Sequence, residues 1–77
     1  MRDPKRIESL LSILAEAWHK WPDQRFGQFL TNFFGMCGYD VWHTEDDEWI
    51  VGLQAFVAGR NPKEEMDVYT EMKTDFE

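Results

Sequence analysis

Apolar residues recur every three or four positions along the first part of the chain, which is the spacing of an amphipathic helix. Asp3 is suited to cap the N-terminus of this helix, and Pro4 fits its first helical position. Pro22 should end it, because the residue before a proline disfavours helical backbone angles. We therefore expect a helix from about 4 to 21. Its predicted buried stripe, which leaves Ile13 outside, consists of Ile7, Leu10, Leu11, Leu14, Ala17, Trp18 and Trp21.

A second helix is expected from about 24 to 36, with Asp23 as its N-terminal cap. Gly27 lies beside the apolar edge of this helix. A glycine inside a helix costs ~1 kcal/mol relative to alanine, so we expect another backbone to approach closely there. The predicted buried stripe consists of Phe26, Phe29, Leu30, Phe33 and Cys37. The opposite side carries a narrow polar arc, made of Arg25, Gln28 and Asn32.

Residues 39–43 alternate in the manner of a β-strand, but no second strand-like run exists with which they could pair. We expect an extended connection whose aromatic side chains fold back on the core. Of the four tryptophans, Trp42 in this connection is the one that we expect to be partly exposed.

A third helix is expected from about 45 to 58, with Thr44 as its cap and Gly59 at its C-terminal end. Between 49 and 58 only Gly52 and Gln54 are not apolar. A helix that is apolar nearly all round is buried on both sides, so another element has to cover its second side.

The last part of the chain can supply that element. Asn61 and Pro62 form a typical helix start, and a helix over 62–75 would place Val68, Tyr69, Met72 and Phe76 on one arc. The predicted fold is therefore all-α, a small bundle of three helices with this C-terminal segment as a fourth helix. We divide the chain into a compact helical domain, residues 1–59, and an acidic C-terminal tail or docked helix, residues 60–77.

Charge narrows the classes of function. The net charge is −7, and residues 26–59 hold five acidic residues and no Lys or Arg. This balance argues against direct binding of nucleic acid and of anionic membranes, and it suits either solubility or a basic partner. The N-terminus has no long apolar run, so we expect no signal peptide and no membrane span. The single cysteine, Cys37, excludes an intrachain disulfide and fits a reducing compartment, so we expect a cytoplasmic protein.

Acidic residues open the third helix, at the favourable positive end of its dipole. They are Glu45, Asp46, Asp47 and Glu48. The run lacks the spacing of a calcium-binding EF-hand loop, and we interpret it as dipole compensation. The N-terminal end of the first helix carries a basic cluster, made of Arg2, Lys5 and Arg6. Positive charge is unfavourable at this end, because the helix dipole is positive there. We expect the acidic run to lie beside this basic cluster.

Few residues offer catalytic or metal chemistry. Cys37, Asp40, His43 and Glu45 are close in sequence, but their spacing matches no zinc pattern. Cys37 could pair with His43 or His19 as thiol and imidazole, yet a lone cysteine beside a phenylalanine-rich helix is more often a core residue. A substrate cleft of ~300 Å³ or more would also be hard to enclose in a chain of 77 residues. We therefore expect no enzymatic activity, no catalytic residue, no metal and no cofactor.

Three segments carry a resemblance when taken in order. They are Arg2-Asp3-Pro4-Lys5-Arg6-Ile7, then Trp18 with Pro22-Asp23-Gln24-Arg25-Phe26-Gly27-Gln28-Phe29-Leu30-Thr31-Asn32, then Glu45-Asp46-Asp47-Glu48. The chain resembles, over residues 2–57, a family of short uncharacterised proteins of bacteria and their phages. The resemblance implies a small helical fold and no established activity, so no catalytic residue is carried over. It also implies that the basic start, the polar arc and the acidic run belong to one design.

Two hypotheses of function follow. The first is a non-enzymatic protein–protein interaction module that binds an unknown protein partner or pairs with itself. The residues that we expect to bind the partner are Arg25, Gln28, Asn32 and Trp42. The alternative is an acidic decoy or inhibitor of a nucleic-acid-binding host or defence protein. This alternative is based on segment 26–59, which has no Lys or Arg, and on the acidic surface of Glu45, Asp46, Asp47 and Glu48.

Overall fold

The computed structural model describes residues 2–74, which form four α-helices and no β-strand. They are α1 (Lys5–Trp18), α2 (Phe26–Cys37), α3 (Asp46–Val57) and α4 (Pro62–Thr74). The all-α prediction is confirmed, and the segment left open as a tail or a docked helix is helical. Residue 75, at which the predicted fourth helix ended, and Phe76 lie outside the described residues.

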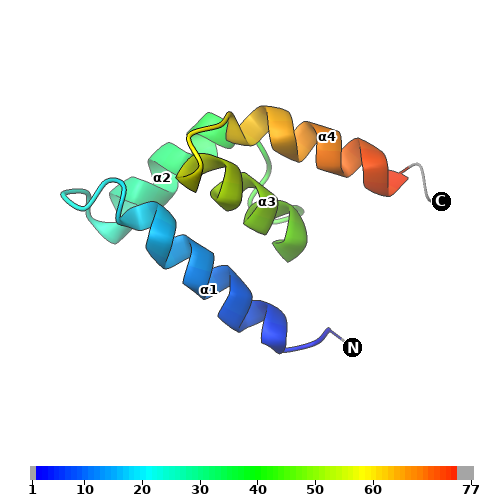
Figure 1. Ribbon diagram of the computed structural model, residues 1–77, viewed down its shortest axis with the longest axis horizontal. Helices are drawn as coiled ribbons and strands as arrows, with labels where there is room; N and C mark the ends of the chain where they lie inside the picture. Colours follow the sequence, from blue (N-terminus) through cyan, green and yellow to red (C-terminus); the bar gives the residue numbers. More distant parts are fainter. Residues whose placement is uncertain (1, 75–77) are drawn as a thin grey trace.

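α3 lies between α1 and α4, and it packs against both (Figure 1). α2 passes behind α3 from the C-terminal end of α1 to the N-terminal end of α4 (Figure 1). The expectation that α3 is covered on two sides is therefore confirmed, and α4 supplies the second cover. Met66 of α4 is fully buried, which shows that α4 contributes to the core.

The core is rich in aromatic rings. The Phe33 ring lies 6.1 Å from the Phe29 and Trp49 rings and 6.0 Å from the Phe56 ring, measured between centroids. Such pairs add ~0.5–1.5 kcal/mol each beyond the area that they bury. With one cysteine the chain has no intrachain disulfide, so its stability rests on packing contacts such as these. The buried apolar residues are Ala17, Phe29, Phe33, Cys37, Trp49, Leu53, Ala55 and Met66.

The buried face of α1 is rotated relative to the predicted stripe. Ile13 packs against the core, although the pattern placed it outside, whereas Ile7 and Leu11 are exposed. The reason is that α1 packs mainly against α3, so only one side of the helix is covered. The wide apolar arc of α1 is therefore only partly buried.

The helix ends show which local signals hold. Asp3 caps α1, because its Oδ1 accepts the N–H of Lys5 at 2.9 Å. α1 ends at Trp18, three residues earlier than expected, because its last turn tightens into shorter-range bonds. Lys20 N–H donates to the Ala17 carbonyl at 3.0 Å, and Trp21 N–H donates to the Trp18 carbonyl at 2.9 Å.

The predicted cap of α2 by Asp23 is wrong. Gln24 N–H donates to the Trp21 carbonyl at 3.1 Å, so Asp23 lies within a turn and α2 begins after Arg25. The Oε1 of Gln28 accepts the Arg25 N–H at 2.8 Å and takes over the capping role.

The extended connection predicted over 39–43 is also wrong, because residues 41–43 form a turn. Asp40 organises this turn: its carbonyl oxygen accepts the N–H and the hydroxyl of Thr44, at 3.1 and 2.6 Å. Thr44 therefore bonds to the preceding turn and does not cap α3. Tyr39 folds back, with its hydroxyl donating to Asp67, while Trp42 remains 88% exposed.

Gly27 does not lie against another backbone, contrary to the prediction. A Cβ built at this position meets nothing within 4 Å, because α1 packs mainly against α3 and leaves that side of α2 open. The close approach occurs instead at Gly52 of α3, where a Cβ would lie 2.6 Å from the sulfur of Met66.

Gly27→Ala is therefore expected to stabilise the fold by about 0.5–1 kcal/mol, since alanine is the better helix former and has free space. Urea unfolding followed by circular dichroism measures the effect. Gly38→Ala is the control and should be destabilising, because Gly38 has a φ of 70° that favours glycine. Loss of stability in Gly27→Ala would contradict the open environment of this residue.

Candidate functional site

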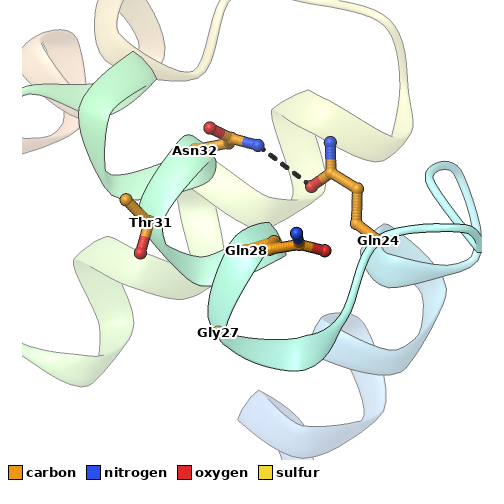
Figure 2. Close-up of a pocket in the computed structure, with 5 residues that line it drawn as sticks. All are labelled: Gln24, Gly27, Gln28, Thr31 and Asn32. Carbon is orange, nitrogen blue, oxygen red and sulfur yellow. Dashed lines mark hydrogen bonds between the residues drawn. The ribbon is translucent and has the colours of Figure 1, made fainter.

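The outer side of α2 carries an open polar hollow of about 510 Å³ (Figure 2). It is lined by Gln24, Gly27, Gln28, Thr31 and Asn32. Two residues of the predicted polar arc, Gln28 and Asn32, thus lie on it, whereas Arg25 is not among the lining residues.

The amides of this hollow already have local partners. Asn32 Nδ2 donates to Gln24 Oε1 at 3.1 Å (Figure 2), and Gln28 binds the N–H of Arg25. Both bonds hold the start of α2, so a structural role accounts for these two side chains. The Arg25 side chain is exposed, and no ion pair is found for it within residues 2–74.

A second hollow of about 340 Å³ lies between α1, α2, α3 and the turn that precedes α3. We call it the apolar groove, because most of its lining is apolar. The apolar lining residues are Leu10, Leu14, Leu30, Phe33, Phe34, Val41, Trp42, Trp49 and Leu53. The polar lining residues are Arg2, Thr44 and Asp46.

Trp42 is the most exposed large apolar side chain among the described residues, and it lines this groove. Leaving such a side chain in water forgoes ~2 kcal/mol or more of burial energy. The turn that carries it is held by Asp40, whose Oδ1 accepts the Trp42 N–H at 3.0 Å. The hydrogen bond from His43, followed by that from Trp42, lowers the pKa of Asp40, so this carboxylate is charged at neutral pH. Trp42 therefore projects from a well-defined turn.

The residues predicted to bind a partner are not brought together. No residue lines both the polar hollow and the apolar groove. Gln28 and Asn32 belong to the hollow, and Trp42 belongs to the groove. The pattern missed the contribution of Leu30 and Leu14 to an open surface, because both were assigned to buried stripes. The sequence did contain one indication of this open surface. The apolar arc on α1 is wider than a single neighbouring helix can cover.

The acidic run was predicted to lie beside the basic cluster of Arg2, Lys5 and Arg6. The structure shows this contact for Arg2 and Arg6. Arg2 Nη2 lies 2.9 Å from Glu45 Oε2, and Arg6 Nε lies 2.5 Å from Asp46 Oδ2. These ion pairs link the start of α1 to the start of α3. Exposed pairs of this kind contribute ~0–1 kcal/mol each.

The other half of the acidic run contacts α4. Lys73 Nζ lies 3.0 Å from Asp47 Oδ2 and 3.3 Å from Glu48 Oε1. Burial by itself would raise the pKa of Asp47, but hydrogen bonds from the Tyr69 hydroxyl and from Lys73 outweigh it and lower the pKa below 3.8. The whole run therefore joins α3 to both neighbouring helices.

Asp47→Asn is expected to destabilise the fold by about 0.5–1 kcal/mol at neutral pH, since the carboxylate is 47% exposed and partly screened. The contribution is present above the unfolded-state pKa and is lost as the pH falls through the lower folded-state pKa. The difference from wild type should therefore shrink below about pH 4 in urea unfolding curves. The control, Asp23→Asn, removes an exposed carboxylate and should match wild type throughout. A difference for Asp47→Asn that is independent of pH would contradict this assignment.

Cys37 and His43 are not arranged for nucleophilic catalysis. Cys37 is fully buried, and burial raises the pKa of its thiol to about 11. A protonated, enclosed thiol is a poor nucleophile. His43 is exposed and pairs with Asp40. Within residues 2–74 no group of three or more His, Cys, Asp or Glu side chains is placed to hold a metal ion.

Comparisons with protein-family models, with curated proteins and with solved structures give no match to this chain. None of the helices in the described part of the chain is long and apolar enough to cross a membrane. The observations thus define a small all-α protein with an apolar groove beside an exposed tryptophan.

Proposed function

We propose that this chain is a non-enzymatic protein–protein interaction module and that its partner binds in the apolar groove, with Trp42 as an anchor. The observation that carries the proposal is the 88% exposure of Trp42 beside a groove of about 340 Å³. Tryptophan is enriched among the residues that dominate binding energies at interfaces. Contiguous exposed apolar surface on a small chain is typical of an interaction site.

The polar arc of Arg25, Gln28 and Asn32 contributes less to partner binding in this proposal. Gln28 and Asn32 are engaged in local bonds that stabilise the start of α2. Arg25 keeps an exposed side chain that can contact a partner, but it lies outside the lining of the groove. We place the interaction in the cytoplasm and without direct contact to nucleic acid, on the grounds of the single cysteine and the net charge of −7.

The decoy alternative receives less support. A nucleic-acid mimic needs unneutralised negative charge, and the four acids of the run Glu45–Glu48 are paired with Arg2, Arg6 and Lys73. Steep weakening of partner binding with salt, together with competition by DNA, would favour this alternative.

Photo-crosslinking in the cells that make this protein tests the module. A photoreactive phenylalanine derivative replaces Trp42 in one variant and Gln54, an exposed polar residue of α3, in a matched control. We expect irradiation to give a discrete crosslinked protein from position 42 and none from position 54. Absence of a crosslink at 42, or the same product from both positions, would refute the proposal.

A further inference from the structure

The apolar surface extends along α1 beyond the groove itself. Ile7 and Leu11 are exposed, and Leu11 is 56% exposed. At 100° per residue, both lie within ~60° of Leu14, which lines the groove. Ile7, Leu11, Leu14 and Trp18 follow one another at intervals of four, three and four residues, which is the spacing of a seam between two packed helices.

α2 supplies the other side of this surface. Leu30 lines the groove, and Phe26 precedes it by one helical turn. The ring of Phe26 is 49% exposed and lies 5.4 Å from that of Trp18, so the apolar surface is continuous between the two helices. From Ile7 to Trp18 the seam is ~16 Å long, or about three turns of helix. Its shape fits one further helix lying along α1.

Acidic residues predominate beside the α1 part of this surface and beside the groove, while Arg25, which precedes Phe26, is basic and exposed. Glu8 follows Ile7 and lies ~60° from Leu11 around α1, and no ion pair is found for it within the described residues. Asp40, on the turn that carries Trp42, is exposed and pairs with the equally exposed His43. Arg2 is the basic residue in the groove lining, and it is paired with Glu45. Segment 26–59, which supplies most of the groove, has no Lys or Arg.

From this combination we infer that the groove binds an amphipathic helix of a partner protein, with Lys and Arg flanking its apolar face. The inference rests on the proposed function and names the chemistry of the partner. A second copy of this chain is a poorer occupant, because both copies would carry a net charge of −7 and repel each other. Helix-in-groove binding uses apolar anchors at i, i+3 or i+4, and i+7, and this surface accepts that pattern.

Two displayed libraries of helix-forming peptides test this inference. Both have randomised apolar anchors, and they differ only in the flanking positions, which are Lys and Arg in one library and Glu and Asp in the other. Each is selected on the wild-type protein. The affinity of enriched peptides is then measured by fluorescence anisotropy on wild type, Leu11→Ser, Trp42→Ala and the control Met72→Ser. Met72 on α4 is 54% exposed and matches Leu11 in exposure.

We expect enrichment from the basic library only, with affinity that falls as salt rises. Leu11→Ser and Trp42→Ala should each weaken binding by about tenfold, which corresponds to the loss of one interface anchor. Met72→Ser should leave the affinity unchanged. Equal enrichment from the acidic library, or no enrichment from either, overturns the inference.

Two further measurements separate this inference from the proposed function. If light scattering shows a dimer that Trp42→Ala dissociates, the groove belongs to a second copy and the basic helix is excluded. If position 42 crosslinks to a cellular protein while the basic library gives no binder, the interaction module stands and only the partner's chemistry is wrong. If basic peptides bind but position 42 gives no crosslink, the proposed function fails in the cell.

Discussion

Phe33→Ala is expected to lower the free energy of unfolding to near zero, so that about half of the protein is unfolded at room temperature. Phe33 is buried at the centre of the aromatic cluster, in contact with the rings of Phe29, Trp49 and Phe56. Removing a buried phenylalanine ring costs ~3–5 kcal/mol, because burial energy is lost and a cavity remains. A core of this size supplies only ~3–5 kcal/mol of net stability. Circular dichroism at 222 nm and thermal unfolding measure the result.

Phe26→Ala is the matched control for this prediction. It removes the same side chain from the same helix, but Phe26 is about half exposed. We expect it to cost about 1 kcal/mol and to leave a cooperative unfolding transition. Equal losses in the two variants would mean that Phe33 is not the centre of the core.

Gly52→Val is expected to detach α4 from α3. Even the Cβ of a side chain at Gly52 would lie 2.6 Å from Met66 Sδ and 3.1 Å from Met66 Cγ. Met66 is fully buried, so its side chain has to be displaced within the packed core. Overpacking of a core costs ~1–3 kcal/mol and occasionally more, and here the cost falls on the contact between two helices. Limited proteolysis should cleave within α4 of the variant, and urea unfolding should show the loss of stability.

The control for Gly52 is Gly35→Val. Gly35 also lies inside a helix, but a Cβ there meets nothing within 4 Å, so the intrinsic helix propensities of the two substitutions are matched and the steric terms differ. Gly35→Val should resist proteolysis in the manner of wild type. Equal behaviour of the two variants would show that the contact between Gly52 and Met66 does not hold α4 in place.

Local signals predicted the helices well and their ends less well. The caps Asp3 and Asn61 and the C-terminal glycine Gly59 act as their residue types indicate. Asp23 and Thr44 have equally suitable side chains, but neither caps a helix. Asp23 lies within a turn and Thr44 bonds to Asp40, because the chain has to reverse direction at those places. Residues 39–43 alternate like a strand, but no partner strand exists. The chain turns around Asp40 instead, whose carboxylate accepts the Trp42 N–H and whose carbonyl oxygen accepts the Thr44 N–H and hydroxyl.

The candidate site was harder to predict than the fold. Trp42 was correctly expected to be exposed, and Arg2 and Arg6 do pair with the acidic run. The groove itself was not predicted, because its lining comes from α1, α2 and α3 together. The periodicity of one helix does not show where its neighbouring helices lie.

The sequence by itself determined that this protein is helical, where its helices lie and that α3 needs covering on two sides. Periodicity and caps are properties of neighbouring residues, so they can be read without the fold. Only the tertiary structure decided which side of α1 is buried, that Gly52 and not Gly27 lies at a close contact, and that an apolar groove stays open beside Trp42. These features depend on which helices become neighbours, and that choice is made by the free energy of the whole packed core.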